Sequence, residues 1–347
     1  MSIEKKYYSG YKLLNKKDLD GRKPELYFCI GTRRGGKTFF YNDYVFSRFA
    51  KHEEKFLLLY RYNNELYNVS ENFFGDIGKN KYTNLSMDQK FLVKDKIVNL
   101  YLKTPEKGSV HCGYACSLNA TDAVKKNSHF LNDTARMLFD EFMPEDNRYL
   151  PDELKKFQSI YTSLSRKYGQ QYRYLPTIFV SNAVTLLNPY FSKTDIPERL
   201  RENTKFLRGH GYVLENSNIH VDGLEESGVY RAFDSEYSKY ASENVYLNDD
   251  ITNIIKRPSE RNQYFLTFSY KNKDFAIRKY ADCLYVDRSV DISNSLKLSA
   301  DKNIKPGFVS KNFRPEILQF LRNYYNQGSF RFKDLESKVA AIKFLSF

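Results

Sequence analysis

The sequence has no tryptophan, four cysteines, four methionines and ten prolines among its 347 residues. Four scattered cysteines are too few for the disulfide framework of a small secreted protein. His111 lies beside Cys112 and Cys116, but no second ligand pair follows them, which argues against a zinc site. Cys29 lies inside an apolar run and is expected in the core. The cysteine content predicts a protein of a reducing, intracellular compartment.

Long apolar runs are also missing. No segment approaches the ~18 consecutive apolar residues that a membrane-spanning helix needs. The first residues, MSIEKKYYSGYKLL, lack the apolar core of a signal peptide. We therefore expect a soluble protein of the cytoplasm with no membrane partner.

Acidic residues are outnumbered by basic ones. The chain has 55 Lys and Arg against 42 Asp and Glu, a formal charge of +13 and a pI of about 9.2. This balance suits a polyanionic partner such as nucleic acid. The abundance of Lys, Asn, Tyr, Phe and Ile is also what an A/T-rich coding sequence produces, so part of the basicity is attributable to composition alone.

One segment carries a complete phosphate-binding motif. After the apolar run 26–30, residues 31–38 (GTRRGGKT) match G-x-x-x-x-G-K-[ST] at every fixed position. Glycines let successive N–H groups point at phosphate oxygens, and the positive end of the following helix faces the same anion. Lys37 is expected to reach the β- and γ-phosphates of ATP, and the Thr38 hydroxyl to ligate Mg²⁺. The nucleotide-binding candidates are Gly31, Thr32, Arg33, Arg34, Gly35, Gly36, Lys37 and Thr38.

Two later segments predict the rest of a hydrolase site. Residues 136–142 (RMLFDEF) place Asp140 and Glu141 after an apolar strand, where Asp140 would hold Mg²⁺ and Glu141 would polarise the attacking water. The alternative is an acidic pair that merely ends a strand at the surface. Residues 176–183 form a further apolar strand, and Asn182 at its end would reach the γ-phosphate or the water, or cap the next helix.

The order of elements predicts a two-part α/β chain. From Pro24 to Phe206, short apolar strands alternate with helical segments, which is typical of a mostly parallel sheet. We expect strands at 26–30, 56–60, 137–140 and 177–181, weaker ones at 91–94 and 97–102, and helices at 37–50 and 152–168. Further along we expect three short strands at 264–270, 274–280 and 283–288, and two helices at 315–326 and 332–345. The expected domains are 1–208, a linker at 209–235 rich in Gly, Ser and Asn, and a smaller α+β domain at 236–347.

These motifs resemble one known family, the genome-packaging ATPases of small short-tailed, double-stranded DNA bacteriophages. The resemblance covers nearly the whole chain. It is carried by GTRRGGKT, by Tyr60-Arg61-Tyr62, by FDEF at 139–142, by SNAV and NPYF at 181–191, and by RPEILQFLRNYYNQGSFRF at 314–332. It implies a P-loop ATPase of the additional-strand, catalytic-glutamate type, working as a homomeric ring that is usually a homopentamer.

The resemblance also implies roles for basic residues. Arg166 matches an arginine that a neighbouring subunit supplies in trans, although a solvated helix residue is the alternative on sequence alone. Lys125 or Lys126 matches a second trans-acting position. Arg61 would lie near Glu141 or the phosphates, as a switch between hydrolysis and DNA grip.

This chain departs from the family pattern in two places. It has Arg33 and Arg34 where one arginine is typical, so either could face the subunit interface. Asn63-Asn64 replace a lysine that faces DNA in a relative, so the DNA-gripping residues are left open.

The C-terminal domain of the family resembles a degenerate RNase H-like nuclease. Thr267 and Ser269 stand where an Asp is expected, and nothing in the sequence makes Asp274, Asp282 and Asp287 converge on a pair of metal ions. We expect no nuclease activity, and a basic platform that docks on nucleic acid and on the portal vertex instead.

The sequence therefore predicts an ATP-driven motor that moves double-stranded viral DNA into a preformed capsid. Its expected partners are DNA, further copies of itself and the portal vertex of the capsid, and a structural RNA is a further candidate. It would act in the cytoplasm of the infected bacterium and transiently at the portal vertex. The alternatives are a non-translocating nucleic-acid-binding ATPase of the helicase or partition type, and a docking or scaffold protein with a structural nucleotide site.

Overall fold

The computed structural model describes residues 7–93, 96–106, 108–166, 172–200, 204–217 and 253–346. The chain divides into two compact units, one of residues 1–182 with 203–244 and one of residues 183–202 with 245–347. In the part of the chain that is described, no helix is both long and apolar enough to cross a bilayer.

The first unit is built on a nine-stranded sheet with the order β3-β4-β5-β2-β6-β7-β1-β9-β8. Strand β7 lies between β1 and β6 and is parallel to both, so the carboxyl ends of all three strands meet at one edge. This is the additional-strand arrangement that the family resemblance implies. The strands are β1 (Leu26–Gly31), β2 (Lys55–Tyr60), β3 (Ser86–Val93), β4 (Ile97–Thr104), β5 (Gly108–Ser117), β6 (Thr134–Asp140), β7 (Thr177–Asn182), β8 (Phe206–Arg208) and β9 (Tyr212–Ser217).

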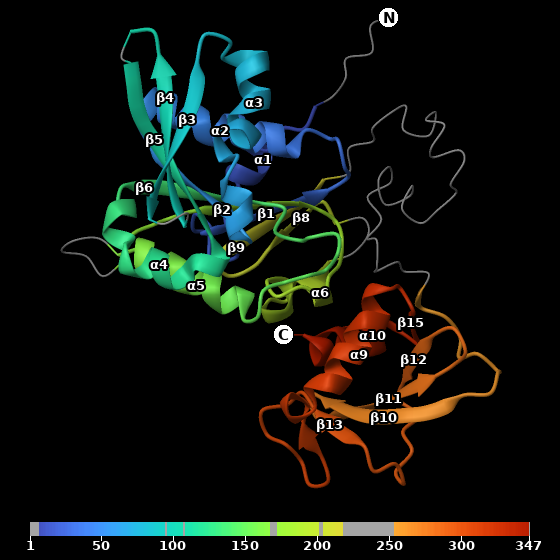
Figure 1. Ribbon diagram of the computed structural model, residues 1–347. Helices are drawn as coiled ribbons and strands as arrows, with labels where there is room; N and C mark the ends of the chain where they lie inside the picture. The colour runs from blue at the N-terminus through green and yellow to red at the C-terminus, as the bar shows by residue number, and fades with distance from the viewer. Residues whose placement is uncertain are drawn as a thin grey trace, which may run out of the picture. The chain divides into compact units, whose positions relative to one another are not determined.

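Helices cover both faces of this sheet (Figure 1). On one face, α2 (Lys37–His52) and α3 (Val69–Lys81) share a buried cluster with Phe56 and Leu58 of β2, and the short α1 (Tyr11–Leu14) joins them. On the other face, α5 (Glu153–Leu164) packs Phe157 against Phe179 of β7, with ring centroids 5.1 Å apart. The short α4 (Thr121–Lys126) lies beside α5. Phosphate loop and acidic strand are thus held by a core packed on both sides.

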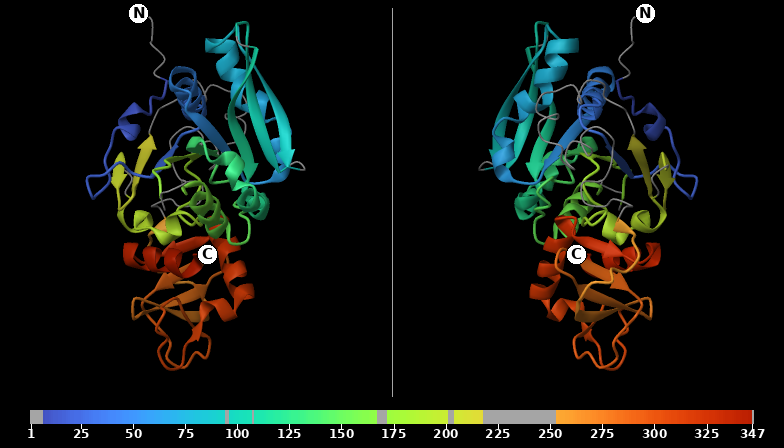
Figure 2. Two further views of the ribbon diagram at one scale, coloured as in Figure 1. Left: turned by 90° about the vertical axis from the view of Figure 1, so that its left-hand side faces the viewer. Right: turned by 90° about the vertical axis from the view of Figure 1, so that its right-hand side faces the viewer.

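Strands β3, β4 and β5 form an antiparallel extension at one edge of the sheet. Figure 2 shows them as a tall ribbon that projects beyond the other strands of the unit. The 3-10 turn η1 (Asn63–Leu66) leads from β2 into α3, whereas η2 (Leu118–Ala120) leads from β5 into α4 and η3 (Ser128–Leu131) follows α4.

The second unit has a six-stranded sheet with the order β14-β13-β10-β11-β12-β15. Its helix α10 (Leu335–Leu345) stacks Phe344 on Phe268 with centroids 4.5 Å apart, and α9 (Pro315–Asn326) packs Phe320 against Phe265 at 5.5 Å. The strands are β10 (Gln263–Tyr270), β11 (Lys273–Lys279), β12 (Leu284–Asp287), β13 (Lys297–Ser299), β14 (Val309–Ser310) and β15 (Phe330–Phe332); α6 (Ile196–Arg199) also belongs to this unit.

The expected domain limits differ from this division in two ways. The segment expected to be a linker begins with β9, which pairs along its length with β1, while residues 218–252 lie outside the described part. Residues 183–202 group with the C-terminal unit, because Lys343 of α10 donates to the carbonyl oxygens of Ser192, at 3.1 Å, and of Thr194. Two glycines just before the short apolar run of β9 led to the linker prediction, and the contacts of Lys343 span about 150 positions in sequence, beyond the reach of local patterns.

Candidate active site

The phosphate loop runs from the end of β1 to the start of α2. Arg34 and Gly36 both have positive φ angles, +59° and +86°, which curl the loop as the glycine pattern predicts. Lys37 is only 7% exposed, and its Nζ donates to the Thr32 carbonyl oxygen and, at 3.4 Å, to Asn182 Oδ1. Burial lowers the pKa of Lys37. The ammonium group is therefore held inside the loop, where an anion would replace its lost hydration.

Gly31 is required by the close approach of β9 to the start of the loop. A Cβ at this position would lie 2.2 Å from the backbone carbonyl oxygen of Ser217, an atom that cannot turn aside. We expect Gly31→Ala to lower the free energy of unfolding by about 1–3 kcal/mol, as overpacking does. Urea unfolding followed by circular dichroism measures this. Gly75→Ala on α3 is the matched control, because a Cβ there meets no atom within 4 Å and should not destabilise; equal losses in both variants would contradict the packing argument.

The acidic pair lies at the end of β6, as expected. The pKa of Asp140 is raised to about 6, mainly by burial; a hydrogen bond with Thr38 opposes the rise, and the adjacent Glu141 adds to it. Glu141 is exposed with a φ of +54°, and its N–H donates to Asp140 Oδ1 at 3.0 Å. Asp140 thus faces the phosphate loop, while the left-handed backbone turns the Glu141 side chain towards solvent.

A cavity of about 260 Å³ joins the expected residues at the carboxyl edge of the sheet. It is lined by the phosphate loop that follows β1, by the acidic pair at the end of β6 and by the polar end of β7. Its lining includes Arg34, Gly35, Gly36, Lys37, Thr38, Asp140, Glu141 and Asn182. A second cavity of about 280 Å³ shares Thr38, Asp140 and Glu141 with it. Cation, hydroxyl, two carboxylates and amide are the groups that phosphoryl transfer to water needs.

Arg61 follows β2 at the same edge and is almost fully buried. Its guanidinium pairs with Glu153 at 2.9 Å and donates to the carbonyl oxygens of Glu141 and Phe142 at 3.2 and 2.8 Å. Arg61 therefore lies near Glu141, as expected, and contacts its main-chain carbonyl oxygen.

A family model described as "Podovirus DNA encapsidation protein (Gp16)" matches residues 4–346. The chain belongs to this family. Phage DNA packaging, which the sequence motifs predict, is thereby confirmed as its function. The DNA packaging protein of Bacillus phage B103 is 25% identical over 317 residues, covering 88% of this chain and 92% of its own. That of Bacillus phage phi29 is 25% identical over 324 residues, covering 88% and 89%.

Solved structures show that the encapsidation protein shares its fold with packaging motors. The chain in "The Phi-28 gp11 DNA packaging Motor" has a TM-score of 0.58 at 15% identity, with 99% of this chain and 98% of that one covered. The chain in "The bacteriophage Phi-29 viral genome packaging motor assembly" has a TM-score of 0.53 at 20% identity, with 95% of each covered.

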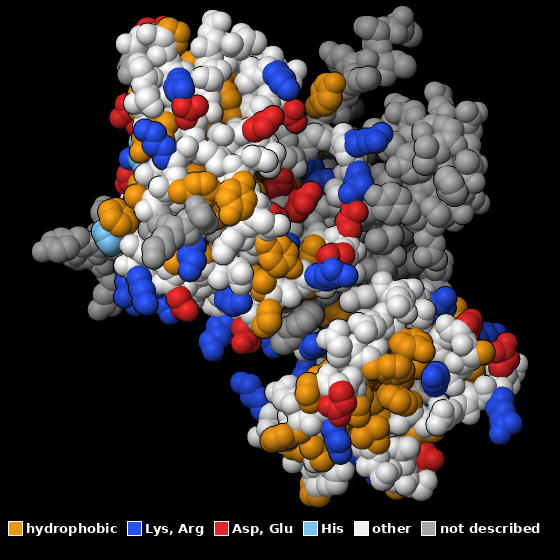
Figure 3. Space-filling view, viewed as in Figure 1, with side chains coloured by type: hydrophobic (Ala, Val, Ile, Leu, Met, Phe, Trp, Pro, Cys, Tyr) orange, Lys and Arg blue, Asp and Glu red, His pale blue; other side chains and the backbone are white. Residues whose placement is uncertain are grey.

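The basic residues of the encapsidation protein expected to act in trans lie away from its own cavity. Helix α5 starts after the acidic loop and ends near the first residue of β6, because Arg173 donates to both Leu164 and Thr134 carbonyl oxygens. Arg166 follows this end and is exposed at the amino edge of the sheet, opposite the phosphate loop. Lys125 and Lys126 are exposed at the end of α4. Figure 3 shows Lys and Arg side chains gathered over α4 and α5.

The two consecutive arginines of the phosphate loop have different surroundings. Arg33 forms an ion pair with Glu145, in the loop that follows the acidic strand. Arg34 lines the phosphate-loop cavity. The Arg33–Glu145 ion pair connects the phosphate loop to the segment beyond Glu141.

Sequence reasoning missed two acids of this region. Glu153 is 1% exposed and holds Arg61. Glu65 lines the second cavity, its Oε2 accepts the N–H of Tyr62 at 2.5 Å, and burial raises its pKa. Glu65 and Tyr62 form a capping box in the structure, but tyrosine is not one of the N-cap residues by which such a box is recognised in sequence. Nothing local marked Glu153 as the partner of an arginine 92 positions earlier.

Asp140 gives the active site a testable pH dependence. A protonated carboxyl cannot hold a cation, and the pKa of Asp140 is about 6 in the free protein. We expect kcat/KM for ATP with Mg²⁺ to fall about tenfold per pH unit below 6 and to be level above about pH 7. Initial rates between pH 5 and 8 measure this profile. Glu65→Gln is the control, because it removes a nearby carboxyl group whose pKa is also raised; the midpoint of the pH–rate profile should stay unchanged in this variant. A midpoint near pH 4, or a midpoint that shifts in Glu65→Gln, would contradict the assignment to Asp140.

Proposed function

We propose that this encapsidation protein is an ATP-driven translocase that moves double-stranded viral DNA into a preformed capsid as a homomeric ring, most simply a homopentamer. The single observation that carries the proposal is the convergence of Lys37, Asp140, Glu141 and Asn182 on one cavity, with an additional strand between β1 and β6. This topology combined with an acid beyond Asp140 is suited to hydrolysis rather than to phosphate transfer.

The residues fit Mg²⁺ and ATP. Thr38 and Asp140 are hydrogen-bonded to each other and offer the hydroxyl and carboxylate oxygens that Mg²⁺ prefers. When bound, Mg²⁺ would neutralise charge on the phosphates. Lys37 would pair with the β- and γ-phosphates, and the N–H groups of the loop from Gly31 to Gly36 would donate to them.

Glu141 would accept a proton from the attacking water as the water oxygen bonds to the γ-phosphorus. The bond from that phosphorus to the leaving oxygen breaks, which gives ADP and inorganic phosphate. Asn182 would orient the water or sense the γ-phosphate. Arg166 of a neighbouring subunit, with Lys125 or Lys126, would neutralise the charge that develops on the transferred group. Arg166 lies at the edge opposite its own cavity, and Lys125 and Lys126 lie outside the lining of that cavity, so these cations suit a neighbour's site.

The domains divide this work. The unit that carries the sheet of β1 is the motor, and the C-terminal unit is a degenerate RNase H-like domain that docks on nucleic acid and on the portal vertex. The strand order supports this relationship: the antiparallel strands β12-β11-β10 are extended beside β10 by β13 and β14, which are parallel to β10. This order is typical of RNase H-like folds.

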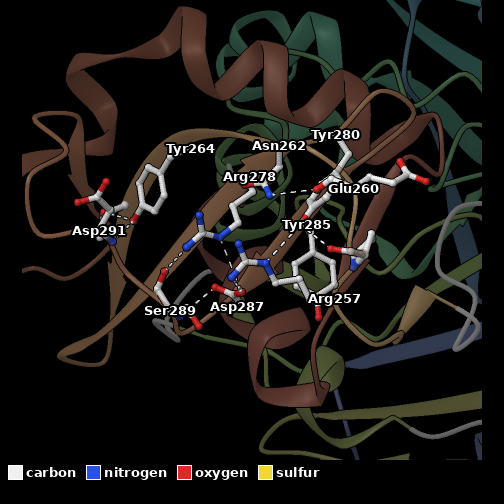
Figure 4. Close-up of polar contacts among 12 residues, drawn as sticks. Arg257, Glu260, Asn262, Tyr264, Arg278, Tyr280, Tyr285, Asp287, Ser289 and Asp291 are labelled. Carbon is white, nitrogen blue, oxygen red and sulfur yellow. Dashed lines mark hydrogen bonds and ion pairs between the residues drawn. The ribbon is translucent and has the colours of Figure 1, made fainter.

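The polar groups of the C-terminal sheet support the absence of nuclease activity. Thr267 and Ser269 are buried on β10, where they bond to Tyr264 and Asp301. Asp287 lies 3.6 Å from Arg257 and 3.8 Å from Arg278, as Figure 4 shows, so its charge is matched by arginines. Among the described residues, no three His, Cys, Asp or Glu side chains are placed to share a metal ion.

Relatives with the same domain order extend the proposal to partners and location. The solved relatives are motor assemblies by name, which supports self-association and a site at the portal vertex, and a structural RNA is a further candidate partner. The protein would move from the cytoplasm of the infected host to that vertex.

Steady-state ATP hydrolysis with and without double-stranded DNA tests the proposal. We expect DNA to stimulate hydrolysis, and the stimulation to fall with salt because grip on a phosphate backbone releases counterions. Hydrolysis that ignores DNA under ring-forming conditions would favour the docking protein with a structural nucleotide site. Strand separation would favour a helicase.

A further inference from the structure

Arg61 joins three parts of the first unit through one buried side chain. Arg61 is 4% exposed and Glu153 is 1% exposed. The Nε and Nη2 groups of Arg61 donate to the two carboxylate oxygens of Glu153 at 2.9 and 3.0 Å. This two-point pairing fixes orientation as well as distance. Glu153 is the first residue of α5, so the start of that helix is fixed to the end of β2.

The same arginine holds the main chain of the acidic strand and the start of α4. Its guanidinium donates to the carbonyl oxygens of Glu141 and Phe142, while its own carbonyl oxygen accepts the N–H of Asn119 at 3.2 Å, just before α4. The backbone around Glu141 and the helices α4 and α5 therefore share one anchor.

The loop between Glu141 and α5 is strained and is held at both ends, so a displacement of one end is transmitted to the other. Glu141, Asn147 and Asp152 all have positive φ angles, +54°, +54° and +53°. Such angles are unfavourable for residues with side chains and persist where the surroundings impose them. Arg61 contacts both ends of this loop, and Glu153 also accepts the N–H of Leu150 at 2.8 Å from within it.

We propose that Glu153 is a positioning residue that couples the catalytic site of one subunit to the helices which that subunit presents to its neighbour. A change in the main chain at Glu141 moves Arg61, and the Arg61–Glu153 pair passes the movement to α5 and hence to Arg166. This inference rests on the proposed function, because it takes Arg166 to act in trans. It makes the readiness of one site depend on the nucleotide state of the next.

Hydrogen exchange tests the coupling within the intact chain. We compare wild type with Glu153→Gln, each with and without a non-hydrolysable ATP analogue and Mg²⁺. In wild type the analogue should slow exchange in the phosphate loop and change it in 153–164 by ~5-fold or more, the lower end of usual coupling between sites. In Glu153→Gln the loop should respond as before and 153–164 should not. Glu71→Gln, an exposed glutamate in the first turn of α3, is the matched control and should behave like wild type.

The outcomes separate this inference from the proposed function. A helix α5 that responds equally in wild type and Glu153→Gln, or in neither, would overturn the coupling. A phosphate loop that does not respond in wild type would instead overturn the nucleotide site. If Glu153→Gln does not fold, Glu153→Asp replaces it: the shorter carboxylate keeps the charge but cannot make both bonds, so a partial loss of the α5 response is expected, and an undiminished response contradicts the proposal.

Mixing experiments give a second readout that a merely structural role would not change. Glu141→Gln subunits keep Arg61, Glu153 and Arg166, so adding them should raise the activity of each Glu153→Gln subunit. Arg166→Ala subunits supply no arginine, so adding them should not. The proposal is wrong if both additions have the same effect in rings whose activity falls linearly when Glu141→Gln is diluted into wild type, because such rings are not poisoned by one inactive subunit.

Discussion

Replacing Glu141 with glutamine should lower DNA-stimulated ATP hydrolysis by about 10²–10⁴-fold, the usual contribution of a general base. Its carboxylate lines the cavity beside Asp140, and an amide of the same shape cannot accept the proton of the attacking water. Since Lys37 and Thr38 are untouched, ATP should bind with nearly unchanged affinity. Single-turnover hydrolysis and equilibrium titration with a fluorescent ATP analogue measure the two quantities separately.

The matched control for Glu141 is Asp146→Asn in the same loop. Asp146 is exposed and outside the lining of the cavity, so its loss should change the rate by less than about twofold, as expected for a group without a role in the transition state. A wild-type kcat in Glu141→Gln would contradict the proposed hydrolytic mechanism, in which Glu141 accepts the proton of the attacking water. It would favour a nucleotide site that only stabilises a docking protein.

Replacing Arg166 with alanine should lower kcat by up to about 10³–10⁵-fold, as the loss of a trans-acting arginine does in comparable NTPases. KM should change little, because the residue lies away from the cavity of its own subunit. The side chain is exposed beyond the end of α5, so thermal unfolding should be unchanged. Lys155→Ala, an exposed cation on the same helix, is the control and should keep its activity.

Mixed rings distinguish a trans role from a cis role. Glu141→Gln provides Arg166 and Arg166→Ala provides Glu141, so a mixture of the two should hydrolyse ATP faster than either protein alone. Full activity of Arg166→Ala would contradict any role in catalysis. A mixture that stays inactive is resolved by diluting each variant into wild type: a loss steeper than linear identifies a coordinated ring poisoned by one subunit, and a linear loss contradicts a shared site.

The phosphate loop and the acidic pair at the carboxyl edge of the sheet could be predicted because each is a short contiguous sequence motif. GTRRGGKT and the Asp140-Glu141 pair each combine a buried strand with the polar residues that follow it, and parallel strands bring such ends to one edge. The helix at Pro315–Asn326 was likewise predicted to the residue, since proline opens it.

The parts that were missed depend on contacts between distant residues. Nothing near Glu153 in sequence distinguishes it from the exposed acids of other helix starts; its burial follows from Arg61. The segment of β9 is predicted to be linker because two glycines precede its short apolar run and polar residues follow it, and the strand forms by pairing with β1 and β8. Strand β5 (Gly108–Ser117) contains small and polar residues, so its strand character depends on its neighbours β2 and β4.

The direction of α5 has a consequence for how the enzyme behaves in dilute solution. Each copy carries its phosphate loop at one edge of the sheet and Arg166 at the other, so under the proposed trans role one copy contributes to two different sites. Specific activity should therefore rise with protein concentration and fall on dilution, with an apparent reaction order above one. In an infected cell, copies that have not yet gathered at a capsid would hydrolyse little ATP, because an isolated copy has no neighbour to complete its site.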